Sequence, residues 1–195
     1  MSFRSHSASC VVLSFALVGC SDDGQLRPAR MRVGTATSGD VVFAAVVEDD
    51  VSVYVCGGDT TFATHTRWFR DIPLDDDGAF EATLEGWTIS GNAETDDITA
   101  DLVGPADEQV ALAGASVPDD GLAGLYTREI DGCTTGLVVR GPDDDPQTQG
   151  TWCDDQGQFA QVIVLPPVVL TAEGIHVEVM RPDPLGLTDF YVAPF

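Results

Sequence analysis

The strongest constraint on the fold is an alternation of apolar and polar side chains with a period of two, which recurs along the chain. Residues 51–56, 80–85, 98–102 and 175–179 all alternate in this way. Successive side chains of a β-strand point to opposite faces of a sheet. Each segment is therefore predicted to be a strand with one buried face and one wet face.

Clusters of Asp, Gly and Pro separate these strands at short intervals, at residues 48–50, 75–78, 104–107, 118–121 and 141–146. Short strands with such frequent turns predict an all-β domain, an antiparallel meander that forms a sandwich or a small barrel. The best helical candidate is a single turn near residues 62–70. Large core side chains are expected from Trp68, Phe80, Leu84, Trp87 and Ile89.

An almost continuous apolar run at residues 162–170 is interrupted by Pro166 and Pro167. A double proline cannot lie inside a central strand, because proline lacks the N–H that the ladder needs. We therefore expect a bend or a crossover between one buried strand and the next.

The first 20 residues have the pattern of a secretory signal. Arg4 precedes an apolar run at residues 11–18, which is far shorter than the ~20 residues of a membrane-spanning helix. The run ends in Leu17-Val18-Gly19-Cys20, which resembles the lipobox of bacterial lipoproteins. The resemblance implies that Cys20 carries a diacylglycerol and becomes the acylated first residue, with palmitate as a typical acyl chain. The alternative is an ordinary secretory signal with a cysteine at its boundary.

The lipobox implies attachment to a membrane through the lipid on Cys20. Ser21, in place of Asp, favours the outer membrane of the cell envelope. Residues 1–19 are then the signal peptide, and residues 20–40, which lack alternation, are expected to form a flexible tether. Residues 41–195 form the all-β domain, which divides into segments 41–117 and 123–195.

The charge balance limits the choice of partners. The chain has 32 acidic and 9 basic side chains, all of the latter arginine, and its formal net charge is −23. Such a surface repels phosphate backbones, so no nucleic acid is expected as a partner. We interpret the acidity as a solvated surface; the alternative is a sink for divalent cations or basic partners.

About half of the mature chain, between residues 41 and 126, is similar to a β-meander segment of secreted and envelope proteins from bacteria with high-GC genomes. The matching parts are an apolar strand, an acidic turn, a Tyr-x-Cys-x-Gly strand, a tryptophan and an Ala-Gly-Leu-Tyr stretch, at residues 41–47, 49–50, 54–58, 68 and 123–126. That group has no established activity. The resemblance therefore implies β architecture and no function.

Three cysteines remain in an oxidising compartment once Cys10 leaves with the signal peptide and Cys20 is lipidated. Cys133 and Cys153 flank a predicted hairpin, and folding it about residues 143–144 brings them nearly opposite each other. We predict a disulfide between these two, and closing a loop of ~20 residues contributes roughly 3 kcal/mol. Cys56 is then expected to be a buried, inert thiol; a disulfide from Cys56 to either partner is the alternative.

The acidic turns contain the candidates for a surface calcium site, Asp75, Asp76, Asp77, Asp143, Asp144 and Asp145. Neither turn has the spacing of an EF-hand loop, and aspartates stabilise tight turns without a metal. The cysteines, His65 and His176 show no zinc-ligand spacing, and both histidines are interpreted as surface residues. No metal and no cofactor are therefore expected.

The sequence contains no catalytic signature. Ser90 has no Gly-x-Ser-x-Gly context, and residues 56–59 lack the lysine and helix of a phosphate-binding loop. We expect a non-enzymatic lipoprotein with a structural or partner-binding role at the surface of the envelope. The alternative is a calycin-like barrel that binds a small apolar ligand among aromatic residues such as Trp68, Phe80 and Trp87.

Replacing the lipobox cysteine tests the predicted anchor. Cys20→Ala removes the thiol that would accept the lipid, so the protein should move from the membrane fraction to the soluble fraction of cell lysates. Cys56→Ala, which leaves the lipobox intact, is the matched control and should stay with the membranes. A Cys20→Ala protein that still sediments with membranes would contradict the lipobox interpretation.

Overall fold

The structure is a computed structural model of the whole chain. It describes residues 30–36, 38–93, 96–118, 120–130, 132–153, 159–180 and 186–195, with the side chains of residues 188 and 190 excepted. The predicted signal peptide and Cys20 lie outside the described residues. Within them the fold is almost entirely antiparallel β structure, which confirms the predicted all-β class.

The first half of the chain forms an eight-stranded sheet that curls into a nearly closed barrel, with the strand order β4-β3-β2-β1-β8-β7-β6-β5. Its strands are β1 (Arg30–Ala36), β2 (Val42–Val47), β3 (Asp50–Cys56), β4 (Arg67–Pro73), β5 (Ala79–Leu84), β6 (Trp87–Asn92), β7 (Asp97–Val103) and β8 (Gln109–Ser116). It is therefore two four-stranded meanders joined where β1 pairs with β8. The only helix described is the single turn α1 (Phe62–His65), inside the predicted range.

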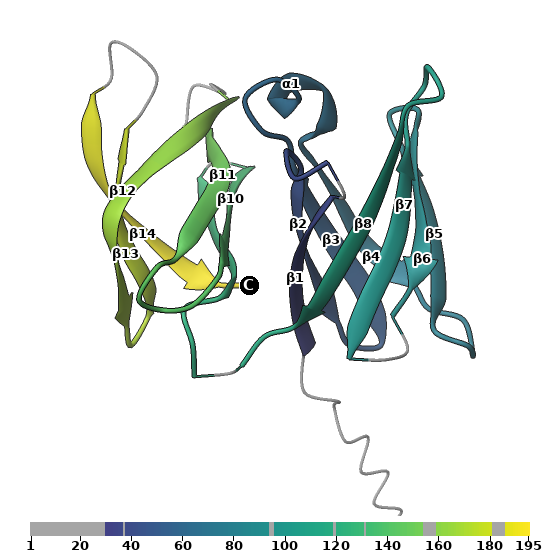
Figure 1. Cartoon of the computed structure of the whole chain (residues 1–195), viewed down its shortest axis with the longest axis horizontal. Coiled ribbons are helices and arrows are strands. Elements are labelled where there is room, and N and C mark those ends of the chain that lie inside the picture. The colour runs from purple at the N-terminus through teal and green to yellow at the C-terminus, as the bar shows by residue number, and fades with distance from the viewer. Residues whose placement is uncertain are drawn as a thin grey trace, which may run out of the picture.

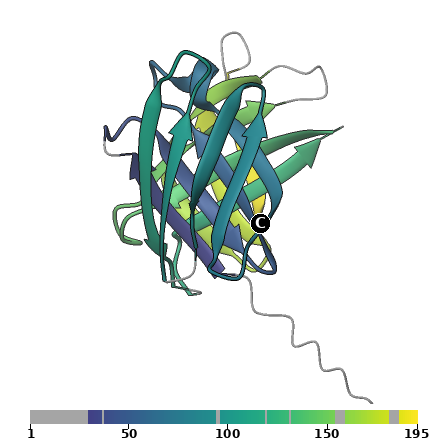
Figure 2. The same ribbon diagram turned by 90° about the vertical axis from the view of Figure 1, so that its right-hand side faces the viewer.

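The second half forms a closed six-stranded barrel in the order β10-β11-β12-β13-β14-β9. Its strands are β9 (Gly124–Ile130), β10 (Cys133–Arg140), β11 (Gln147–Cys153), β12 (Phe159–Thr171), β13 (Gly174–Met180) and β14 (Leu187–Pro194). The two barrels lie side by side, and β1 to β4 face the second barrel (Figure 1). In the perpendicular view, β5 to β8 lie in front and the second barrel lies behind them (Figure 2).

Each barrel has its own apolar core. The first is built from inward-facing residues of all eight strands, including Phe43, Phe69, Phe80, Trp87 and Ile89. Three of the five predicted large core residues, Phe80, Trp87 and Ile89, are thus confirmed. The prediction for Leu84 was wrong: it is 38% exposed, because it ends the edge strand β5.

The prediction of a flexible tether over residues 20–40 was wrong for residues 30–36, which form strand β1. Residues 30–36 are a central strand between β2 and β8, whereas residues 20–29 and residue 37 lie outside the described part. The alternation is hidden because Arg32 occupies an inward position and is fully buried, donating from Nη2 to the carbonyl of Ala93 at 3.3 Å. The other face of β1 is also covered, since Met31 and Val33 pack between the barrels.

A third apolar cluster joins the two barrels. It contains Val42, Ala44 and Val46 of β2, Tyr54 and Cys56 of β3, and Leu125 and Val138 from the second barrel. The predicted wet face of residues 51–56 is therefore wrong: Tyr54 and Cys56 are fully buried on that face, and Ser52 is nearly so. Trp68, expected in the core of the meander, packs at the edge of this cluster instead.

Tyr54 is the central contact between the barrels. Its ring lies against Trp68 with centroids 4.4 Å apart, and its hydroxyl donates to the carbonyl of Gly136 or to Oγ1 of Thr151, both at 3.2 Å. A Cβ added to Gly136 would lie 2.6 Å from the tyrosine ring. Only a glycine on β10 lets the ring approach the backbone so closely. Gln149 adds two hydrogen bonds between the barrels, from Nε2 to the carbonyls of Asp40 and Cys56.

The double proline lies within a single long strand. Pro166 and Pro167 fall where the register between β12 and β13 shifts, between Leu165 and Val169, and the peptide bond between them is cis. The expected boundary between two buried strands was therefore wrong: β12 continues through the prolines and pairs with β13 on both sides. The prolines are tolerated because their missing N–H groups fall at the register shift. The second core lies inside this barrel and includes Tyr126, Leu137, Trp152, Ile175 and Val179.

Gly136→Ala should destabilise the protein by about 1–3 kcal/mol, because the new methyl group overlaps the ring of Tyr54 in a packed interior. Gly124→Ala, on the adjacent strand β9, is the matched control, since its added Cβ would meet the ring of Tyr126 at an ordinary 3.6 Å. Urea unfolding of both variants measures the difference. Equal stabilities for the two variants would mean that the fit of Tyr54 against Gly136 is not required.

Candidate functional site

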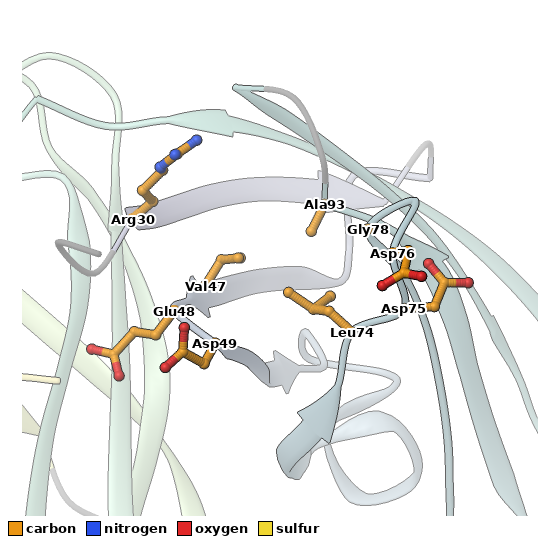
Figure 3. A pocket seen from close by; sticks show the side chains of 9 residues that line it. All are labelled: Arg30, Val47, Glu48, Asp49, Leu74, Asp75, Asp76, Gly78 and Ala93. Atoms are coloured by element: carbon orange, nitrogen blue, oxygen red, sulfur yellow. The ribbon is translucent and has the colours of Figure 1, made fainter. Parts of the chain in front are cut away.

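The first candidate is a cavity at one mouth of the first barrel, about 450 Å³ in volume. Figure 3 shows Glu48 and Asp49 on one side of it and Asp75 and Asp76 on the other. The cavity is completed by Arg30 at the start of β1 and by apolar side chains between the two acidic turns: Val47, Leu74 and Ala93.

Among the acidic side chains around this cavity, Asp75 stabilises the backbone of its own turn. Oδ1 of Asp75 accepts hydrogen bonds from the backbone N–H groups of Asp77 and Ala79, at 3.0 and 2.7 Å. Within the described residues, no group of three or more His, Cys, Asp or Glu side chains is placed to hold a metal ion. The calcium candidates Asp75, Asp76 and Asp77 therefore form a capped turn and not a ligand cage.

The other calcium candidates, Asp143, Asp144 and Asp145, lie in the turn between β10 and β11. Oδ1 of Asp143 accepts from the backbone N–H of Leu122 at 2.8 Å. This bond ties the turn to the segment that links the two barrels. Like Asp75, Asp143 stabilises backbone that would otherwise lack a partner.

The second candidate is a surface on the outside of the second barrel, which we call the apolar face: Ile163, Val169, Met180, Leu187 and Tyr191. Cross-strand register places Ile163, Met180 and Leu187 in one row over β12, β13 and β14. Val169, His176 and Tyr191 form a second row. These apolar side chains are between 43% and 60% exposed, although they neighbour each other across the sheet.

Polar side chains lie between the two rows. Glu178 pairs in register with Leu165 and with Asp189. Nε2 of His176 lies 3.0 Å from Oδ1 of Asp189, and the imidazole stacks on Tyr191 with ring centroids 4.3 Å apart. These contacts hold the Tyr191 ring in a defined position on the surface. The predicted surface position of His176 is confirmed, since its side chain is 32% exposed.

This apolar face was not predicted from the sequence. The run 162–170 was expected to be buried throughout, yet Ile163 is 59% exposed while Val162 is buried. The alternation is concealed because apolar residues occupy both faces of β12. The available signal was the lack of polar residues on an outer face in a chain that is 21% charged.

His65 was predicted to lie on the surface, and this was wrong. It is 9% exposed, because α1 turns it toward Trp87, with ring centroids 4.8 Å apart. Burial lowers its pKa, and the charge of Arg67 lowers it further. The guanidinium of Arg67 also packs on Trp87, 4.2 Å from the centre of its ring.

The cysteines follow the prediction. Cys133 and Cys153 form a disulfide, with Cα atoms 6.0 Å apart, and Cys56 is a free, buried thiol. Burial raises the pKa of the Cys56 thiol to about 11, even though hydrogen bonds from Tyr54, Thr66 and Gln149 act in the opposite direction. A thiol with so high a pKa is a poor nucleophile at neutral pH.

Comparison with known proteins found no matching family model, no similar curated protein and no similar solved structure. In the part of the chain that the structure describes, no helix has the length and apolar character needed to cross a bilayer. The candidate sites therefore rest on the geometry alone.

The Cys56 thiol should make stability depend on pH in the alkaline range. An unfolded chain ionises this thiol near pH ~8.5, whereas the folded pKa is about 11. The stabilisation is thus fully present below pH ~8.5 and is lost as the pH rises toward the folded value. Raising the pH from about 8 to about 10 should remove about 2 kcal/mol more from the native protein than from Cys56→Ala, by urea unfolding. The same loss in both proteins would contradict this assignment.

Proposed function

We propose that the chain is a lipid-anchored envelope protein, held by the lipid on Cys20, and that it binds a protein partner through the apolar face. The observation that carries the partner-binding role is the distribution of exposed apolar side chains. Of the nine large ones found among the described residues, seven belong to β12, β13 or β14. Concentrated apolar surface of this kind marks an interaction site, whereas single exposed apolar residues do not.

The negative charge on and around the apolar face limits which partners can bind there. Glu178 and Asp189 lie between the two apolar rows, and the formal net charge of the chain is −23. A strongly acidic partner would be repelled before contact. A partner with an apolar patch and a neutral or basic rim fits this surface best.

An enzymatic role has little support. The only free thiol described has a raised pKa, and the acidic turns use carboxylates to cap backbone N–H groups. The alternative of an apolar ligand inside a barrel also has less support. Both barrel interiors are packed with core side chains, and a cavity of about 330 Å³ beside Met31, Leu125 and Leu170 lies between the barrels and not inside either one.

Site-specific photo-crosslinking in cells tests the role of the apolar face. A photoreactive amino acid at Met180 should give a discrete adduct with a protein partner. The same group at Asp101, on the outer face of β7, is the matched control and should give none. Adding Leu187→Glu should abolish the Met180 adduct without unfolding the protein, because Leu187 is 54% exposed. Adducts that persist with Leu187→Glu, or that form equally from Asp101, would overturn the proposal.

A further inference from the structure

A groove of about 570 Å³ runs over the outer face of the first barrel, next to the place where β10 ends. Small side chains from three neighbouring strands line it: Thr35 of β1, Ala113 and Ala115 of β8, and Thr99 of β7. Asp97 lies at one side and Arg140, the last residue of β10, at another. The groove is on the first barrel, whereas the apolar face is on the second.

Arg140 is a cation without a partner in this groove. Its Nε is buried and has no hydrogen-bond partner, and its guanidinium forms no hydrogen bond or ion pair with any residue that the structure describes. Two other arginines are engaged: Arg67 donates to the carbonyls of Thr64 and His65, and Arg70 donates to Oγ1 of Thr134.

Although the chain has 32 acidic residues, no carboxylate in the part that the structure describes pairs with Arg140. Burial lowers the pKa of Arg140, and no described carboxylate acts against this effect. For Arg67, by contrast, burial is opposed by the charge of Glu85. Asp97, the acidic residue in the groove, acts on the buried Arg32. A half-buried cation with no counter-charge is costly unless a ligand supplies the charge.

We propose that Arg140 and this groove bind a small aliphatic monocarboxylate. The planar guanidinium matches a carboxylate through two parallel hydrogen bonds. The short side chains of Ala113, Ala115 and Thr35 leave room for a slender hydrocarbon body to lie along the sheet. A doubly charged phosphate fits less well, because Asp97 and the net charge of −23 repel a dianion more strongly.

The direct test uses the full chain with ¹⁵N-labelled arginine, in which each Nε–H gives a signal that can be followed by NMR. Hexanoate is titrated through the millimolar range at about 0.15 M salt, where charges beyond ~8 Å are screened. The Nε–H signal of Arg140 should shift and saturate, and acetate should bind at least about threefold more weakly because it lacks most of the hydrocarbon body. A signal that does not saturate, or phosphate binding more tightly than hexanoate, would overturn the proposal.

Three variants distinguish binding at this groove from a general effect of the protein's charge. Arg140→Gln should weaken hexanoate binding by about tenfold or more, and Arg140→Lys by about threefold to tenfold, since lysine keeps the charge but loses the planar fork. Arg128→Gln removes the same charge from an exposed position on β9 and should leave the affinity unchanged. Equal weakening by Arg128→Gln and Arg140→Gln would contradict the site, and the titration of the native chain decides the matter even if Arg140→Gln does not fold.

Discussion

The arrangement of the whole molecule depends on the fit of Tyr54 against Gly136. Tyr54 comes from the outer face of β3, and Gly136 lies on the outer face of β10, so this contact joins two barrels that each have a separate core. A tyrosine can be fully buried there because Gly136 and Thr151 satisfy its hydroxyl. An unsatisfied hydroxyl in that position would cost about 1–3 kcal/mol, so packing and hydrogen bonding act together at the junction.

This junction decides which surfaces remain for partners. It covers the outer faces of β2 and β3, so apolar residues such as Val42 and Val46 are buried although they point away from the first core. The outer face of β12, β13 and β14 lies away from the junction, as Figure 1 shows, and no described segment covers its apolar residues. Similar outward-facing apolar residues therefore have different roles: those on β2 hold the barrels together, and those on β12 to β14 are available to another molecule.

The sequence predicted those elements in which one face is apolar and the other polar. Strands β5, β7 and β13 follow the alternation, and the disulfide followed from the symmetry of one hairpin about residues 143–144. Strand β1 was missed because Arg32 is buried at an inward position, and the far face of β3 was misjudged because a second barrel covers Tyr54. Local alternation cannot report a partner that lies more than eighty residues away in the sequence.

The candidate surfaces were harder to predict for a related reason. The polarity of a side chain is known from the sequence, but whether another part of the fold buries it is not. The run 162–170 and residues 41–47 are both apolar, and only the tertiary arrangement separates an exposed Ile163 from a buried Val46. For Arg140 the informative property is that no carboxylate among the described residues pairs with it, which can be seen only when the acidic turns are placed in space. In so acidic a chain, an isolated cation or an uncharged surface therefore marks a site better than any cluster of aspartates does.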